Sequence, residues 1–173
     1  MNKLVIFDLD GVLIESRELH YHSLNDALKS IDPSYVIGRD EHLSVYDGLN
    51  TTKKLKLLSE TKGLPTEYHD MVWQRKQLAT FELIKKFPVD DKLVDIFSKL
   101  KALGYYIAIA SNSIRETVKL SLLKIGVMEY VDYYASNQDV INPKPYPEMY
   151  WKCMIACNAL PKNTLIIEDS HIG

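Results

Sequence analysis

The chain has 173 residues, of which 46% are hydrophobic and 25% are charged, which is the balance of a single globular domain or of one domain that carries an insertion. Its 21 basic and 23 acidic residues give a net charge of −2, so composition gives no bias toward nucleic acid or an anionic membrane surface. The apolar runs fall well short of the roughly 20 residues that a membrane span needs. We therefore expect a globular protein with no nucleic-acid and no membrane partner.

Two features of the sequence favour a cytoplasmic location. An acidic residue falls too early in the N-terminal stretch MNKLVIFDLD for a secretory signal. The two cysteines, Cys153 and Cys157, are four residues apart on one face of an expected helix, and we interpret them as buried small apolar side chains. Unpaired thiols fit a reducing compartment.

The first predicted element is a short strand at residues 4–7, because the continuous apolar sequence LVIF is typical of a parallel strand that is buried on both faces. Two carboxylates, Asp8 and Asp10, follow it at once, and Gly11 comes next. Two charges about 4 Å apart repel each other by roughly 4 kcal/mol at an effective dielectric constant of 20. The arrangement therefore needs a chemical reason, which the rest of the chain supplies.

Residues 16–87 are predicted to be helical. Apolar residues recur at helical spacing over 16–31, a cap at Asn50 precedes a second helical stretch that ends at Gly63, and a third stretch ends before Pro88. This much helix is too long for a single crossover between two strands. We interpret residues 16–87 as a small helical domain inserted after the first strand.

The rest of the chain alternates between strands and helices. Strand-like runs at 106–111, 130–136 and 164–169 are separated by helical patterns. At the start of one of these helices, Ser113 and Glu116 have the spacing of a capping box. Alternating β-α-β units form a parallel sheet with helices on both faces.

The predicted fold class is therefore α/β. Residues 1–15 and 88–173 are expected to form a Rossmann-like core around the parallel sheet, and residues 16–87 the inserted α-helical domain. In such open sheets, ligands bind at the carboxyl ends of the strands.

Polar side chains stand at the predicted carboxyl ends of these strands. They are Asp8 and Asp10 after the first strand, Ser111 and Asn112 after the second, Glu168 and Asp169 after the last, and Lys144 in the loop NPKPYP. Four potential negative charges around one lysine repel one another, and a divalent cation resolves this repulsion. Oxygen ligands without thiolates favour Mg²⁺, which binds through one or two carboxylates together with a substrate phosphate. Lysine, hydroxyl and backbone N–H groups would then hold the phosphate oxygens.

These residues resemble the haloacid dehalogenase superfamily of phosphotransferases and hydrolases. The resemblance runs along the whole chain and covers four motifs in order: FDLDGVL, IASNS, the lysine of NPKPYP, and IIEDSHIG. The inserted helices look like the cap domain that family members carry after the first motif. The resemblance implies a Mg²⁺-dependent enzyme with a Rossmann-like core and a helical cap that selects substrates.

The resemblance also implies a role for each motif residue. Asp8 corresponds to the nucleophile that forms an aspartyl-phosphate, and Asp10 to the general acid/base that protonates the leaving alcohol and then activates water. Ser111 corresponds to the phosphate-binding hydroxyl and Lys144 to the motif lysine. We add Asn112 to the phosphate-binding set through its backbone N–H group.

The same resemblance implies how the metal is held. Mg²⁺ would be bound by Asp8, by the carbonyl group of Asp10 and by Asp169, with Glu168 helping through a water molecule. Family members that remove halide lack the second aspartate and need no metal. The presence of Asp10 therefore points away from dehalogenation and toward phosphoryl transfer.

Within the superfamily, the chain resembles the branch of β-phosphoglucomutases and phosphoglycolate-type phosphatases. His20 falls where mutase-like relatives have a cap histidine, which makes it a candidate substrate contact. The segment DGLNTTKK resembles the place where mutases have an arginine, but Thr51 stands there in this chain, and we interpret Lys53 and Lys54 as solvated. We therefore predict a phosphatase that acts on a small phosphomonoester, either a sugar phosphate or a phosphoglycolate-like metabolite.

Two alternatives stay open. The first is a sugar phosphomutase of the β-phosphoglucomutase type, which would depend on a bisphosphate activator. The second is a truncated, inactive member that only binds phosphate or Mg²⁺, since the chain stops at Gly173 directly after the fourth motif. The last strand would then be an open sheet edge that permits strand pairing, so we expect a monomer or a weak dimer.

Overall fold

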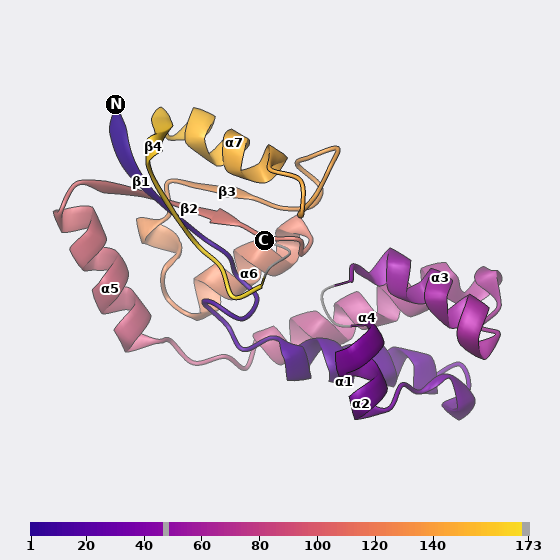
Figure 1. Cartoon of the computed structure of the whole chain (residues 1–173). Helices are drawn as coiled ribbons and strands as arrows, with labels where there is room; N and C mark the ends of the chain where they lie inside the picture. The colour runs from indigo at the N-terminus through magenta and orange to yellow at the C-terminus, as the bar shows by residue number, and fades with distance from the viewer. Residues whose placement is uncertain (47–48, 171–173) are drawn as a thin grey trace. The chain divides into compact units, whose positions relative to one another are not determined.

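The computed structural model describes residues 1–46 and 49–170. The chain separates into two compact units, of which the first consists of Met1–Glu15 together with Ile84–Gly173 and the second of Ser16–Leu83. Figure 1 traces both along the chain, with a sheet in the first and helices in the second.

The first unit is built on a four-stranded sheet in which every neighbouring pair of strands is parallel. The strands are β1 (Asn2–Phe7), β2 (Tyr105–Ala110), β3 (Tyr133–Ala135) and β4 (Ala159–Ile167), and their order across the sheet is β3-β2-β1-β4. β1 lies between β2 and β4, and its residues from Leu4 to Phe7 are buried. The predicted α/β fold with a parallel sheet is confirmed.

Three α-helices connect these strands: α5 (Asp91–Ala102), α6 (Arg115–Lys124) and α7 (Glu148–Ala156). The third strand is shorter than the predicted run over 130–136, because Met128–Tyr130 forms a 3₁₀ turn before it. The fourth strand begins earlier than predicted, directly after α7.

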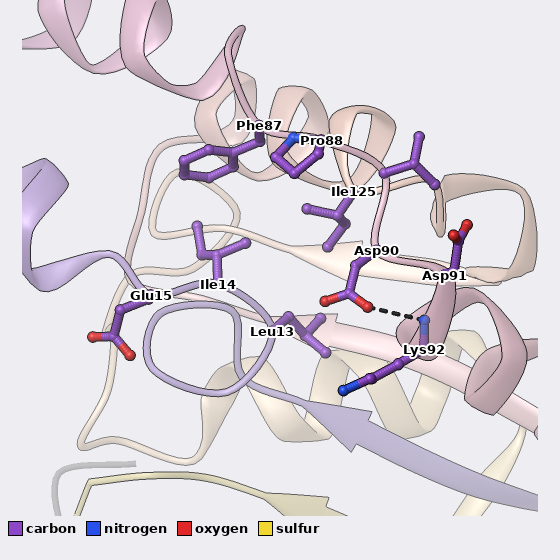
Figure 2. A pocket seen from close by; sticks show the side chains of 10 residues that line it. Leu13, Ile14, Glu15, Phe87, Pro88, Asp90, Asp91, Lys92 and Ile125 are labelled. Atoms are coloured by element: carbon purple, nitrogen blue, oxygen red, sulfur yellow. Dashed lines mark hydrogen bonds between the residues drawn. The ribbon is translucent and has the colours of Figure 1, made fainter.

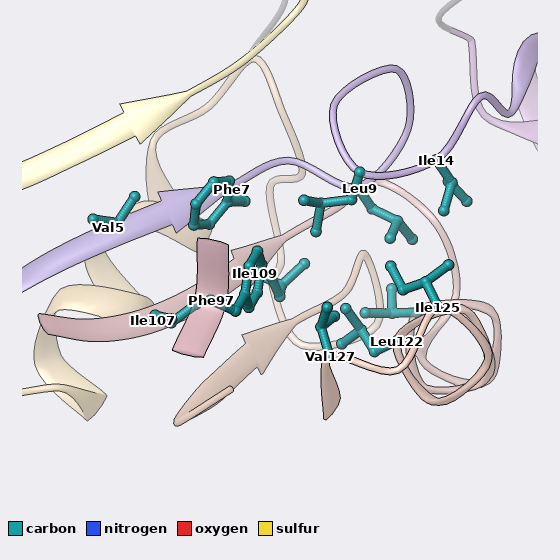
Figure 3. Close-up of a cluster of buried hydrophobic side chains, with 12 residues drawn as sticks. Val5, Phe7, Leu9, Ile14, Phe97, Ile107, Ile109, Leu122, Ile125 and Val127 are labelled. Atoms are coloured by element: carbon teal, nitrogen blue, oxygen red, sulfur yellow. The ribbon is translucent and has the colours of Figure 1, made fainter. Parts of the chain in front are cut away.

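The helices cover the sheet on opposite faces, as the alternation of side chains along β1 requires. On one face, Val5 and Phe7 pack in a cluster with residues of α5 and α6 (Figure 3), and the rings of Phe7 and Phe97 stack with their centroids 4.9 Å apart. On the other face, Leu4 and Ile6 pack with residues of α7. This double burial explains the uninterrupted apolar sequence of β1.

The start of α5 gives a first testable prediction. Asp90 caps the helix, and its Oδ1 accepts hydrogen bonds from the backbone N–H groups of Lys92 and Leu93, each at 3.0 Å. The variant Asp90→Ala should therefore lower the free energy of unfolding by about 1 kcal/mol. Urea unfolding measures this, with Asp91→Ala as the control from the same turn. Equal losses in the two variants would contradict the capping role.

In the described residues of the second unit, all the secondary-structure elements are helices or helical turns. Its elements are α1 (Arg17–Lys29), a 3₁₀ turn (Pro33–Tyr35), α2 (Arg39–Glu41), a π turn (His42–Tyr46), α3 (Thr51–Lys62), a second 3₁₀ turn (Thr66–Tyr68) and α4 (His69–Ile84). Leu24, Leu28 and Leu58 are among the buried residues of its own apolar cluster. Asn50 caps α3 by accepting from the Lys53 N–H group, as predicted, and Gly63 ends the helix at a φ of 69°.

One interpretation of this unit is wrong, and one segment of interest falls partly outside the described residues. Lys54 was expected to be solvated, but it is only 8% exposed, because α3 places it beside the buried Leu55 and one turn before Leu58. Asp47 and Gly48, which begin the segment compared with the mutases, lie outside the described residues. Among the helices of the described residues, none is both long enough and apolar enough to cross a membrane.

Candidate active site

The carboxyl ends of the strands bring together the polar residues that the sequence singles out. β1 is in register with β2 and β4, with Phe7 opposite Ile109 and Ile167. The residue after β1, Asp8, continues this pairing by donating its backbone N–H to Ile167 O at 2.9 Å. Glu168 follows β4 directly, so its carboxylate lies beside that of Asp8.

Lys144 joins these two carboxylates. Its Nζ lies 2.7 Å from Asp8 Oδ1 and also donates to Glu168 Oε1. Burial raises the pKa of Asp8 to about 7, although the Lys144 ammonium acts to lower it. Burial alone would lower the pKa of Lys144, but attraction to Asp8 and hydrogen bonds to both carboxylates outweigh burial and raise it. The lysine is therefore a fixed positive charge at the base of the site.

The backbone of Lys144 is held by Asn112. The Lys144 N–H group donates to Asn112 Oδ1 at 3.0 Å, and Asn112 Nδ2 donates to the Lys144 carbonyl at 3.2 Å. The Asn112 carbonyl in turn accepts from Asn137 Nδ2 at 2.8 Å. The Asn112 side chain thus positions the lysine, and any contact with phosphate falls to its backbone N–H group.

The end of the loop that carries Lys144 is also fixed. Glu148, at the start of α7, accepts backbone N–H groups from Asn142 at 2.8 Å and from Ile141 at 3.0 Å. These donors, that of Asn142 first, lower the pKa of the Glu148 carboxyl. The loop is therefore tied at both ends, and the ammonium reaches the site from a rigid base.

Asp10 is oriented by two serines. Ser113 Oγ donates to Asp10 Oδ2 at 2.9 Å, and Ser111 Oγ donates to the same oxygen at 3.3 Å. The predicted capping box of Ser113 and Glu116 is therefore wrong: Ile114 is the N-cap of α6, and the first N–H group of the helix, that of Arg115, donates to Gln138 Oε1 at 2.9 Å. The Ser113 hydroxyl serves Asp10 instead, a long-range contact that the local spacing does not reveal.

Three carboxylates offer a site for a cation. Asp8, Glu168 and Asp169 each present an oxygen, and the three oxygens lie within 4.8 Å of one another. Gly11 makes room for this arrangement, because a Cβ atom built on it would lie 2.1 Å from Asp169 Oδ2. An all-oxygen, predominantly negative donor set fits Mg²⁺. The backbone N–H group of Gly11 is used inside the turn, where it donates to Ile14 O at 2.8 Å.

A second prediction concerns Gly11. The variant Gly11→Ala should weaken Mg²⁺ binding by at least about tenfold, because the new methyl group displaces Asp169 from the cation. Its φ of +89° adds a loss of about 1 kcal/mol in stability. Gly104→Ala is the matched control, since Gly104 has a φ of +79° and open space around its Cβ position. Calorimetric titration with Mg²⁺ should show a defect in Gly11→Ala alone, and equal affinities would contradict the prediction.

Of the remaining predicted site residues, His20 lies in the helical unit, on α1, where it is half-buried. Tyr150 is not among the predicted site residues, yet it is a buried residue of α7 whose hydroxyl group donates to Glu168 Oε1 at 3.0 Å. No local pattern marks this tyrosine, because its partner is 18 residues away in the sequence.

The first unit also has a separate cavity of about 510 Å³, lined by residues of 13–15 and 87–92 together with Ile125 (Figure 2). Its apolar wall is formed by Leu13, Ile14, Phe87 and Ile125. The acidic lining residues include Asp90, whose carboxylate already caps α5. Asp8, Lys144 and Glu168 are not among its described lining residues. The cluster of carboxylates and Lys144 at the strand ends is therefore the candidate site, and this cavity is not.

Comparisons with known proteins show the family of the chain. Residues 5–173 match the sequence profile of the haloacid dehalogenase-like hydrolases. The chain therefore belongs to this family, and the resemblance drawn from its motifs is confirmed.

Individual proteins of known sequence or structure are also similar to the chain. Pyrophosphatase PpaX of Bacillus cereus (strain Q1) is 27% identical over 175 residues, which cover 96% of this chain and 74% of that protein. The crystal structure of β-phosphoglucomutase from Clostridium difficile has a TM-score of 0.82 at 22% identity and covers all of this chain and 78% of that one. A structure described as a predicted phosphoglycolate phosphatase, from Haemophilus somnus 129pt, has a TM-score of 0.78 at 21% identity, over 95% of this chain and 76% of that one.

The descriptions of these proteins, two phosphatases and a phosphomutase, are of the kind that the motifs resemble. The structures share their fold with this chain, and the family assignment makes the chain an enzyme of the hydrolase class with phosphatases among its relatives.

Proposed function

We propose that this protein is a Mg²⁺-dependent phosphatase that hydrolyses a small phosphomonoester through an aspartyl-phosphate on Asp8. The observation that carries the proposal is the buried ion pair of Asp8 and Lys144, whose charged atoms lie 2.7 Å apart. The carboxylates of Glu168 and Asp169 lie beside this pair. A buried carboxylate at the carboxyl ends of parallel strands is suited to attack phosphorus, because the fixed cation beside it balances the charge of the phosphoryl oxygens.

The residues divide the reaction between them. An oxygen of Asp8 attacks phosphorus, and the bond from phosphorus to the leaving oxygen breaks as Asp10 gives that oxygen a proton. Asp10 then takes a proton from water as the water attacks the aspartyl-phosphate, which releases phosphate and restores Asp8. Ser113 and Ser111 support this role, because their hydroxyl groups fix the orientation of Asp10.

Asp8, Asp169 and the carbonyl group of Asp10 would hold Mg²⁺, with Glu168 beside them. When bound, the cation neutralises charge on the carboxylates and on the transferring phosphoryl group. Lys144 would contact phosphate oxygens from the protein side. The hydroxyl group of Ser111 would join it by exchanging its 3.3 Å hydrogen bond to Asp10 for one to the phosphate, which leaves Ser113 to orient Asp10.

The helical unit is proposed to act as a cap that selects the substrate. Residues 16–87 were predicted to be an inserted domain, and His20 on α1 is its candidate substrate contact. A cap of this kind excludes water from the reacting phosphoryl group when it closes.

The substrate class extends to phosphoanhydrides. PpaX is described as a pyrophosphatase, and the two similar structures as a phosphomutase and a predicted phosphoglycolate phosphatase. The assay should therefore include a substrate for each of these three reactions. We propose a simple phosphatase over a mutase, because Thr51 stands at the position where mutases have an arginine.

The experiment is a panel of phosphoglycolate, a hexose 1-phosphate, inorganic pyrophosphate and an aryl phosphate, each with Mg²⁺ and with EDTA. We expect phosphate release that requires Mg²⁺ and no activator. Isomerisation of the hexose phosphate that depends on added hexose bisphosphate would show a mutase instead. A folded protein that binds Mg²⁺ but turns over none of the four would support an inactive phosphate-binding member.

A further inference from the structure

Tyr150 touches both partners of the ion pair that lies next to the proposed nucleophile. Its hydroxyl group donates to Glu168 Oε1 at 3.0 Å, and the Lys144 Nζ atom lies 5.3 Å from the centre of its ring. The residue is 7% exposed and sits on α7, six positions after the lysine. One rigid side chain therefore contacts a carboxylate through its hydroxyl group and a cation through its ring face.

The two contacts affect Glu168 in a specific way. Its Oε1 atom accepts from both Lys144 Nζ and the Tyr150 hydroxyl group. With one carboxylate oxygen held by two donors, the other oxygen is the one left for a cation or its water. A carboxylate that is oriented in this way loses less rotational freedom when it engages a metal.

We propose that Tyr150 is a positioning residue that orients Glu168 for Mg²⁺ and holds Lys144 toward Asp8. The inference rests on the proposed Mg²⁺-dependent function, since it concerns the same site. Tyr150 itself touches no reacting atom, and its effect passes through Glu168 and Lys144.

The alternative is that Tyr150 is only a core residue. Its ring does pack in the apolar cluster between α7 and the sheet, with Leu4, Ile6 and Cys153. The variant Tyr150→Phe separates the two roles, because it keeps the ring, its packing and its contact with the ammonium and removes only the hydroxyl group. A purely structural role predicts no change in metal affinity beyond a small change in stability.

The test is isothermal titration of the metal-free protein with Mg²⁺ in the absence of substrate. Tyr150→Phe should bind Mg²⁺ about tenfold more weakly than the wild type, with a melting temperature close to that of the wild type. Tyr133→Phe is the matched control, because Tyr133 packs against the same cluster and has no described contact with Glu168. Its affinity should stay within about twofold of the wild type.

A double-mutant cycle identifies the route of the effect. In a Glu168→Gln background, removal of the Tyr150 hydroxyl group should change Mg²⁺ affinity by less than about twofold, because the two residues act as one unit. A tenfold loss that persists in this background would overturn the proposed route through Glu168.

The outcomes separate the inference from the proposed function. If the wild type binds Mg²⁺ and Tyr150→Phe binds it equally well, the inference is overturned and the function stands. If Tyr150→Phe loses affinity but the wild type hydrolyses no phosphate ester, the positioning role holds and the function fails. A wild type that binds no Mg²⁺ would overturn both.

Discussion

The variant Asp8→Asn is expected to lose phosphatase activity on the order of 10³-fold or more, in line with the losses caused by removing a nucleophile in other enzymes. An amide nitrogen or oxygen cannot form the acyl phosphate that a carboxylate forms. The fold should survive, because Lys144 keeps Glu168 as a charged partner and asparagine has nearly the volume of aspartate. Steady-state hydrolysis of an aryl phosphate with Mg²⁺ measures the effect.

Asp91→Asn is the control for this experiment, since Asp91 is exposed at the start of α5 and should leave the rate unchanged. Circular dichroism and thermal unfolding would verify that both variants are folded. Retention of more than about a tenth of the activity by a folded Asp8→Asn would show that another group attacks phosphorus.

The second large effect is expected from Lys144→Met. This change leaves Asp8 and Glu168 facing each other without the buried cation between them, so the metal-free protein should lose about 3 kcal/mol of stability. Activity should fall on the order of 10²- to 10³-fold, because a fixed positive charge beside the transferring group is lost. Urea unfolding and the aryl phosphate assay measure the two effects.

The loss of stability should depend on pH in a defined direction. Burial raises the pKa of Asp8 from 3.8 to about 7 even with the lysine present, and removing the lysine raises it further. A carboxyl group with a raised pKa in the folded state favours folding while it is protonated, and this contribution disappears as pH rises through the folded-state value. The metal-free variant should therefore be less stable at pH 8 than at pH 5, relative to the wild type.

Lys101→Met is the matched control for Lys144→Met. Lys101 also pairs with a carboxylate, that of Asp132 at 2.6 Å, but its side chain is 33% exposed and lies outside the site. It should lose at most about 1 kcal/mol and no activity. If both lysine variants lose the same stability with the same pH dependence, the buried charge arrangement does not have the energetic role described.

Much of the fold could be predicted from the sequence because the strong signals are local. The apolar run of β1 has no polar interruption, so it fits only a strand buried on both faces, and Asn50 and Gly63 bound α3 as their backbone preferences require. The extent of β3 was overestimated because Tyr130 and Val131 are as apolar as the strand itself. The 3₁₀ turn that excludes them is set by packing, which the sequence pattern does not contain.

The charged residues of the site could be predicted from the sequence, but the residues that orient them could not. Asp8 and Glu168 stand at strand ends, and the topology of a parallel sheet brings strand ends together regardless of detail. Ser113 and Tyr150 were misassigned or missed because their partners, Asp10 and Glu168, lie far away in the sequence. Lys54 was assigned to solvent on its charge alone, although helical spacing placed it beside buried leucines.

The proposed aspartyl-phosphate on Asp8 can be detected directly. The protein would be mixed with an aryl phosphate and Mg²⁺, quenched in acid within the first turnover, digested and analysed by mass spectrometry. We expect a phosphoryl group on the peptide that contains Asp8, located at that residue by fragmentation and absent from Asp8→Asn. Turnover without any phosphorylated peptide, or with the phosphoryl group on another residue, would contradict the assignment of Asp8 as the nucleophile.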